Sequence, residues 1–142
     1  MIVAVGLDLV EVERIKRAVE RQPLKFQQRC FHPDELAELE GRLDVYPGLA
    51  ARFAAKEAFA KCWRSSLKWT DVWVTKDGVR PLLMTSERLS QALDAERLVI
   101  HLSLTHTAKH AAAVVVLEHV ESDIAAASDL GQAPEHLTRQ TE

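Results

Sequence analysis

Apolar and polar residues follow different periods in different parts of the chain, and the first change of period falls near residue 10. Ile2 to Leu9 is an almost unbroken apolar run of strand length, which predicts a β-strand covered on both faces and ending near Asp8. In residues 10–22 apolar residues recur at i, i+3 and i+7, and arginines recur with the same spacing on roughly the opposite side (Arg14, Arg17 and Arg21). This pattern predicts an amphipathic helix that Pro23 ends.

Two further helices are predicted before the chain changes to a strand-like pattern. Residues 32–42, HPDELAELEGR, have a proline that suits a first helical turn and a leucine stripe behind it. The sequence YPG at 46–48 predicts a break. Residues 49–64 contain no glycine or proline and are rich in alanine, which predicts the third and longest helix.

The second half of the chain is strand-like. β-Branched and aromatic residues on both sides of Lys76-Asp77-Gly78 predict a hairpin, and Ser86 can cap a short helix after it. Residues 98–107 alternate between apolar and polar, and residues 111–117 predict a last, fully covered strand. The expected fold is therefore an α+β domain over residues 1–118, with a mainly antiparallel sheet packed on one long central helix.

Composition narrows the class of protein only a little. The chain has 142 residues and a net charge of −3, which is typical of one domain and gives no reason to expect nucleic acid binding. The acidity lies mostly in residues 119–142, which have no clear apolar period and are predicted to form a mobile tail. The two cysteines lack metal-site spacing, and the apolar start has no basic segment before it, so we expect a cytoplasmic protein without a membrane span.

The segment RFAAKEAFAKCW, residues 52–63, combines the pattern of a buried helix with four charges (Arg52, Lys56, Glu57 and Lys61). Glu57 and Lys61 could form an ordinary i,i+4 ion pair, and Asp8 could be a turn carboxylate. A carboxylate on so apolar a helix nevertheless needs a specific partner, and a cation is one. If the helix crosses the end of the first strand, Asp8 and Glu57 converge and could hold Mg²⁺, or Mn²⁺, against a phosphate that Lys61 also faces.

Other kinds of site have little support in the sequence. The histidines form no HExxH motif and the cysteines no CxxC motif, which argues against zinc. GxGxxG, Walker and GxSxG motifs are also missing from the sequence. Spacing alone therefore predicts a divalent metal with a phosphate, and no particular reaction.

Three motifs together give a more specific expectation. GLDLVEVERI at 6–15, RFAAKEAFAK at 52–61 and SLTHT at 103–107 resemble the holo-acyl carrier protein synthases, the small bacterial class of 4′-phosphopantetheinyl transferases. The resemblance spans residues 1–118. It implies Mg²⁺-dependent transfer of phosphopantetheine from coenzyme A to a serine of acyl carrier protein, releasing adenosine 3′,5′-bisphosphate, for fatty acid biosynthesis. It also implies a homotrimer with active sites at subunit boundaries.

The resemblance assigns roles to particular residues. Asp8 and Glu57 would be the metal ligands, with Glu57 also able to polarise the serine hydroxyl, and Lys61 would contact phosphate and assist the leaving group. Two sets would bind the substrates: for the acidic carrier protein, Arg14, Arg17 and Arg21; for coenzyme A, Arg52, Lys61 and His106. Alternatively, the arginines form only a solvated face and His106 is satisfied at a strand end.

One segment departs from the family pattern. Members usually have a glycine-containing loop after the KEAxxK segment, whereas residues 62–69 here read CWRSSLKW. Arg64 and Ser65 could supply coenzyme A contacts in place of that loop. This departure keeps two other functions open: a non-catalytic module that binds acyl carrier protein, and a metal-dependent hydrolase of a nucleotide diphosphate.

Overall fold

A computed structural model describes residues 1–121 of the chain. Five helices, five strands and a short 3-10 helix follow one another in this order: β1 (Ile2–Glu11), α1 (Val12–Arg21), α2 (Pro23–Cys30), α3 (Pro33–Leu39), α4 (Tyr46–Cys62), η1 (Trp69–Asp71), β2 (Val72–Asp77), β3 (Arg80–Thr85), α5 (Glu87–Ala95), β4 (Leu98–His106) and β5 (His110–His119). The predicted tail beyond residue 121 lies outside the described residues. Within the described part of the chain, no helix is both long and apolar enough to cross a membrane.

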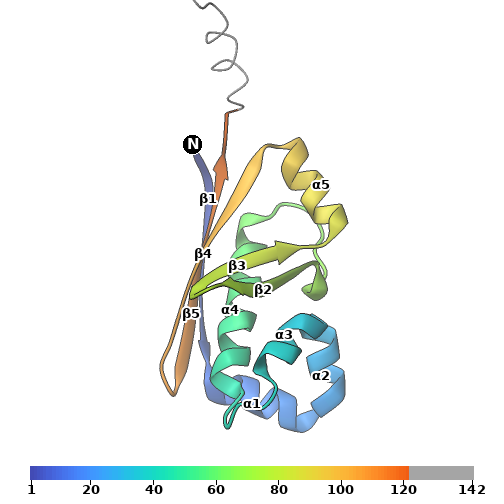
Figure 1. The fold of residues 1–142 in the computed structure, drawn as a ribbon, viewed down its shortest axis with the longest axis vertical. Coiled ribbons are helices and arrows are strands. Elements are labelled where there is room, and N and C mark those ends of the chain that lie inside the picture. Colours follow the sequence, from blue (N-terminus) through green and yellow to red (C-terminus); the bar gives the residue numbers. More distant parts are fainter. Residues whose placement is uncertain (122–142) are drawn as a thin grey trace, which may run out of the picture.

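The strands form two antiparallel sheets. The larger has the order β1-β5-β4, and the smaller pairs β2 with β3 around a turn in which Gly78 adopts a positive φ of 61°. Figure 1 shows all the helices on one side of the larger sheet, with α4 lying along it. This arrangement confirms the predicted α+β class with an antiparallel sheet on a long central helix.

A glycine lets the first strand lie directly against the central helix. A Cβ atom on Gly6 would sit 1.9 Å from the carbonyl oxygen of Ala58 and 2.9 Å from the Cys62 sulfur. Residues at alternate positions face the same way along a strand, so Asp8 and Val10 follow Gly6 on the face turned toward α4. Val10 is buried in the core, and Asp8 is partly covered.

The opposite face of the larger sheet is exposed, so the prediction of strands covered on both faces was wrong for this single chain. A row of apolar residues on β1 faces away from the helices, and Val5 and Leu9 are 62% and 67% exposed. On β5, Val114 is also 36% exposed, while its neighbours on the inner face are buried. An apolar run shows that both faces avoid water, but it does not show whether the cover comes from the same chain.

Two helix boundaries also differ from the prediction, and proline explains both. Tyr46, Pro47 and Gly48 form the first turn of α4 instead of a break, because proline is tolerated where the helical N–H groups have no partner. Pro23 does end α1, but it also starts α2, which the sequence pattern did not predict. Four helices therefore precede the hairpin instead of three.

Candidate active site

Asp8 and Lys61 meet where β1 crosses α4. The Nζ atom of Lys61 lies 3.1 Å from Asp8 Oδ1 and donates a second hydrogen bond to the Leu7 carbonyl oxygen at 2.6 Å. The Asp8 side chain is 16% exposed and that of Lys61 51% exposed, so the pair lies at the rim of the crossing and is open to solvent. Side chains on a helix tilt toward its N-terminus, so Lys61 reaches back over the turn that carries Glu57.

Glu57 is the one charged residue of the RFAAKEAFAKCW segment whose side chain has no ion-pair or hydrogen-bond partner within residues 1–121. It precedes Ala58, the residue that touches Gly6, and it stands one turn before Lys61. The contact between β1 and α4 thus brings Lys61 to Asp8, and Glu57, one turn earlier on the helix, lines a cavity with Leu67 and Trp69. The sharing of one cation by the two carboxylates stays a prediction.

The donor chemistry of this region suits a hard cation. Carboxylate oxygens are the ligands that Mg²⁺ prefers, and two of them with retained water and phosphate oxygens make a common site. Among residues 1–121 the carboxylate of Glu57 has no partner, and Lys61 contacts Oδ1 of Asp8. No group of three or more His, Cys, Asp or Glu side chains that could hold a metal by themselves occurs in residues 1–121. The arrangement therefore fits a cation that a substrate phosphate also ligates.

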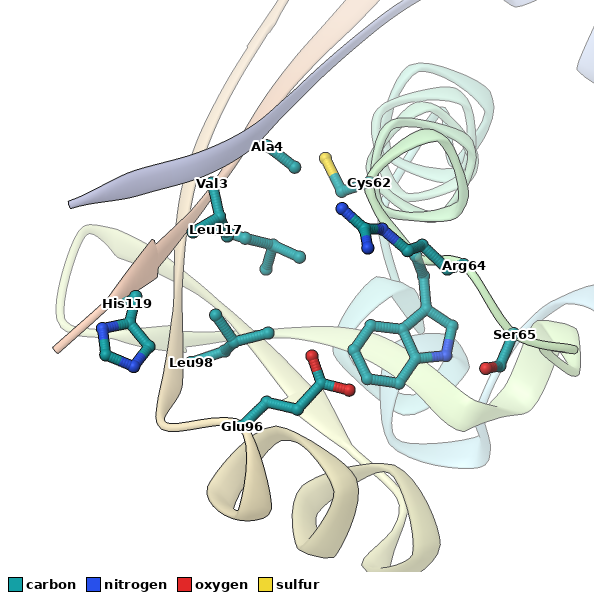
Figure 2. Close-up of a pocket in the computed structure, with 10 residues that line it drawn as sticks. Val3, Ala4, Cys62, Arg64, Ser65, Glu96, Leu98, Leu117 and His119 are labelled. Atoms are coloured by element: carbon teal, nitrogen blue, oxygen red, sulfur yellow. The ribbon is translucent and has the colours of Figure 1, made fainter.

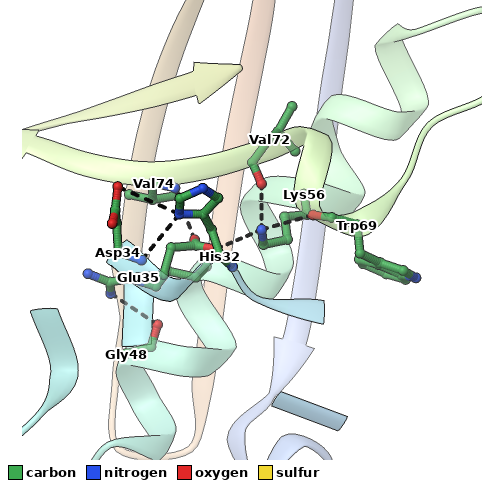
Figure 3. Close-up of polar contacts among 9 residues, drawn as sticks. His32, Asp34, Glu35, Gly48, Lys56, Trp69, Val72 and Val74 are labelled. Atoms are coloured by element: carbon green, nitrogen blue, oxygen red, sulfur yellow. Dashed lines mark hydrogen bonds and ion pairs between the residues drawn. The ribbon is translucent and has the colours of Figure 1, made fainter. Parts of the chain in front are cut away.

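The two other cations of the segment are used inside the protein. Lys56 is 1% exposed and lies 2.6 Å from Oε1 of Glu35, which is 0% exposed. Burial lowers the pKa of Lys56, while the adjacent Glu35 carboxylate opposes this shift. Figure 3 shows Lys56 between Glu35 on α3 and the backbone of Trp69 and Val72.

Arg52 is likewise buried, at 4% exposure. Its Nη2 donates to Glu38 Oε2 at 2.8 Å and its Nη1 to the Gly48 carbonyl oxygen at 3.3 Å, while its Nε has no partner among the described residues. The sequence analysis assigned Arg52 to coenzyme A. In this chain its guanidinium is held between α3 and α4. Within residues 1–121 it makes no hydrogen bond or ion pair with Asp8 or Lys61.

The remaining predicted coenzyme A residues lie at opposite ends of the larger sheet. Arg64 and Ser65 line a cavity of about 210 Å³, into which Figure 2 shows Arg64 and Glu96 extending. This cavity adjoins Leu98, the first residue of β4, whereas His106 is the last residue of the same strand. At a rise of about 3.3 Å per residue, the two ends are roughly 25 Å apart. One chain therefore does not bring these residues into a single compact site.

The predicted carrier-binding arginines do share a surface. Arg14, Arg17 and Arg21 line one shallow groove together with Leu9, Glu11 and Ala18. All three are exposed, and only Arg17 has an ion-pair partner within residues 1–121, Glu13 at 3.5 Å. The groove thus combines unpaired positive charge with an exposed apolar strand residue.

Glu35 and Glu38 were missed in the sequence analysis, although a signal for the first was present. Glu35 stands four residues before Leu39, so on a helix both share the buried stripe. A carboxylate in that stripe requires a buried cation, and Lys56 had no assigned role on the alanine-rich helix. Reading the two helices together would have paired them.

Comparison with known proteins identifies the class. Residues 4–115 match the 4′-phosphopantetheinyl transferase superfamily, and the chain belongs to this family. The holo-[acyl-carrier-protein] synthase of Thermus thermophilus is 49% identical over 118 residues, which cover 83% of this chain and 94% of that relative.

Solved structures of the same class have the same fold. The holo-[acyl-carrier-protein] synthase of Neisseria meningitidis superposes with a TM-score of 0.76 at 31% identity, covering 83% of this chain and 99% of that one. The Bacillus anthracis holo-(acyl-carrier-protein) synthase, solved in complex with CoA (3′,5′-ADP), gives a TM-score of 0.70 at 31% identity and covers 84% and 99%. The resemblance inferred from three short motifs is thereby confirmed over most of the chain.

Proposed function

We propose that this chain transfers 4′-phosphopantetheine from coenzyme A to a serine of apo-acyl carrier protein, giving the holo-carrier and adenosine 3′,5′-bisphosphate, as a step of fatty acid biosynthesis. The observation that carries the proposal is the meeting of Lys61 with Asp8, one helical turn after Glu57, in a chain that matches the transferase family over residues 4–115. The curated relatives are named for the same activity.

The main task of the protein in this reaction is to position the substrates and to stabilise the charge that develops in the transition state. The serine oxygen forms a bond to the phosphorus of the pantetheine phosphate, and the bond from that phosphorus to the bridging pyrophosphate oxygen breaks. Lys61 is placed to stabilise the negative charge that grows on the leaving bisphosphate. Glu57 is the available acceptor for the serine proton, directly or through water, because its carboxylate has no partner among residues 1–121.

Asp8 and Glu57 are the residues that would hold Mg²⁺, with Mn²⁺ as the substitute that suits the same oxygens. When bound, such an ion would supply Lewis-acid polarisation of the pyrophosphate. The chain itself joins the Lys61 ammonium to the Asp8 carboxylate where β1 crosses α4, one helical turn after Glu57.

The arginine groove on α1 is proposed to receive the acidic carrier protein. Arg14, Arg17 and Arg21 are exposed along one side of the groove, an arrangement that attracts an acidic partner and orients it before contact. The groove borders the outer face of β1 through Leu9, so a docked carrier would lie beside that strand.

We further propose a homotrimer with the active sites at its subunit boundaries. Two features support this assembly: the exposed apolar row on β1, which a neighbouring subunit would cover, and the separation of Arg64 and Ser65 from His106, which two adjacent chains could bring together. Sedimentation equilibrium should give three times the chain mass of 15.9 kDa. A monomer at assay concentration would contradict the proposal.

The two cysteines are buried free thiols, which suits the reducing cytoplasm in which we place this activity. The decisive assay incubates the protein with apo-acyl carrier protein, coenzyme A and Mg²⁺ and weighs the carrier by mass spectrometry. A gain of the phosphopantetheine mass is expected. A stable complex without that gain would favour the non-catalytic binding module, and release of pantetheine phosphate without any carrier would favour the hydrolase.

A further inference from the structure

The ion pair between Glu35 and Lys56 is more deeply buried than stability alone requires. Both side chains are essentially inaccessible, with exposures of 0% and 1%. Removing two charges from water is costly, and well-packed apolar residues of similar size are often equally stabilising in such a place. A buried pair therefore calls for a role in fixing geometry.

The pair connects three parts of the chain through backbone hydrogen bonds. Glu35 Oε1 accepts from the His32 N–H at 3.1 Å and Oε2 accepts from the Val74 N–H at 2.9 Å. These bonds fix the start of α3 to β2, and Figure 3 shows them around the carboxylate. The carboxylate is thus saturated by Lys56 and two backbone donors.

Lys56 fixes the segment that follows the central helix. Its Nζ donates to the carbonyl oxygens of Trp69, at 3.0 Å, and of Val72. The same two residues line a cavity of about 200 Å³ together with Leu67, Lys56 and the adjacent Glu57. The wall opposite Glu57 is therefore held in place by the residue next to Glu57 in the sequence.

We propose that Glu35 and Lys56 are a positioning pair for the transfer reaction: they hold the Trp69–Val72 backbone in the wall of the cavity that Glu57 also lines, and this cavity receives part of coenzyme A. This inference rests on the proposed transferase function. Neither residue touches the reacting atoms; the pair acts through Glu57 and through the cavity wall. Residues 62–69, which follow α4, contain no glycine, and the bonds from Lys56 to the Trp69 and Val72 carbonyl oxygens anchor the backbone there.

The test compares Lys56→Met, which keeps the length of the side chain but removes its donors, with Lys56→Gln, which keeps an amide donor for one of the two carbonyl oxygens. Coenzyme A affinity is measured by titration calorimetry without carrier, and transfer kinetics are measured for both substrates. Lys56→Met should raise the Kd and KM for coenzyme A about tenfold or more, because small displacements of a reacting group have large effects. Lys56→Gln should recover part of that loss, and the KM for the carrier should stay within about twofold of wild type.

A matched control separates positioning from loss of stability. Leu93→Ala removes a buried side chain on α5, which does not line the Glu57 cavity, and should lower the melting temperature. Assayed at a temperature where circular dichroism shows each variant folded, Leu93→Ala should keep wild-type affinity for coenzyme A. If Lys56→Met does not fold, the same measurements are made on Glu35→Gln. This variant keeps the shape of the Glu35 side chain but removes the negative charge that pairs with Lys56.

The outcomes divide clearly. Coenzyme A affinity that is unchanged in the folded Lys56→Met, or in Glu35→Gln when that variant replaces it, overturns the positioning role, as does an equal rise in both KM values. A wild-type protein that binds coenzyme A but does not transfer it would refute the proposed function, while the calorimetric comparison would still decide the role of the pair. A wild-type protein that does not bind coenzyme A would overturn both.

Discussion

The central helix carries charge into two environments that differ in how fully its side chains are partnered. Toward α3 and the hairpin, Lys56 and Arg52 are buried, and each has a carboxylate partner within 2.8 Å. Toward β1, Lys61 and Asp8 are joined at 3.1 Å in contact with solvent. Glu57, one turn before Lys61, has no ion-pair or hydrogen-bond partner in the described part of the chain.

The difference separates residues that hold the fold from residues that can react. A group whose hydrogen-bonding capacity is filled by its own chain has little left for a ligand, and breaking such a buried pair is costly. A carboxylate left unpaired next to a cation at a surface crossing keeps its capacity for a metal ion or a substrate. Replacing residues in the first environment should therefore lower stability, and should change activity only through the backbone that those residues hold. Replacing residues in the second should lower activity with little loss of stability.

The largest expected effect is in the open environment. Asp8→Ala and Glu57→Ala should each lower the rate of phosphopantetheine transfer by about a thousandfold or more, because each removes charge placed at the reacting phosphate. The melting temperature should change little, since neither side chain fills the core. The measurement is kcat from the mass-spectrometric assay beside thermal unfolding.

Asp94→Ala is the control for these two variants. Asp94 is an exposed carboxylate on α5, so its removal should leave both kcat and the melting temperature near wild type. Normal turnover in Asp8→Ala or Glu57→Ala would show that the open environment is not the reacting site. A large fall in melting temperature would show that it belongs with the structural pairs.

The next effect comes from the contact that brings the open environment together. Gly6→Ala places a Cβ atom 1.9 Å from the backbone oxygen of Ala58, which cannot move without shifting the helix. The variant should lose about 1–3 kcal/mol of stability and should also lose transfer activity, because β1 and with it Asp8 must move away from Lys61.

Gly41→Ala is the matched substitution elsewhere in the fold. Gly41 has a φ of 78° and open space around it, so alanine there is strained by about 1–2 kcal/mol without touching the site. The control should therefore lose stability while the kinetics of the folded protein remain unchanged. Equal kinetic losses in both variants would mean that Gly6 matters only for stability.

A smaller effect is expected from the arginine groove. Arg14→Glu combined with Arg21→Glu should raise the KM for the carrier about tenfold, or about 1.4 kcal/mol, with little change in the KM for coenzyme A. The rise should shrink at high salt because exposed charges are screened. Lys76→Glu, an exposed reversal on β2, should leave the carrier KM unchanged. If the double reversal does not change the carrier KM, the arginines of α1 do not bind the carrier and form only a solvated surface.

The elements of the fold were largely predictable because periodicity reports local structure. The amphipathic α1, the alternating β4 and the glycine turn of the hairpin were each visible in the spacing of apolar residues. The turn of Tyr46–Gly48 was not, because proline followed by glycine suits both a loop and a first helical turn.

The site was predictable in its residues but not in their partners. Asp8, Glu57 and Lys61 were selected from the conflict between an apolar helix and its charges, and the structure brings Lys61 to Asp8. Whether Arg52, Lys56 or Lys61 is buried depends on where α3 packs against α4. The packing of one helix on another is only weakly indicated by the sequence. The exposed face of β1 could not be predicted for a similar reason. An apolar residue indicates burial, but not whether its own chain or another chain covers it.

The smallest effect tests a third, fully partnered carboxylate, at the junction of η1 and α5. Asp71 accepts hydrogen bonds from the Lys68 N–H and the Ser86 hydroxyl at 2.8 Å and from Arg88 at 2.6 Å, so Ser86 stands at the start of α5 with its hydroxyl turned to Asp71 instead of capping the helix. Burial by itself would raise the pKa of Asp71, but these bonds lower it below its ordinary value of 3.8.

A carboxyl with a lowered folded pKa stabilises the protein fully above its unfolded pKa, and this contribution is lost as the pH falls through the folded pKa. Asp71→Asn should therefore cost about 1 kcal/mol near neutral pH, and this cost should shrink as the pH falls below about 4. Denaturant unfolding at a series of pH values measures the difference. A difference in stability that does not vary with pH would show that the lost interactions do not depend on the charge of Asp71.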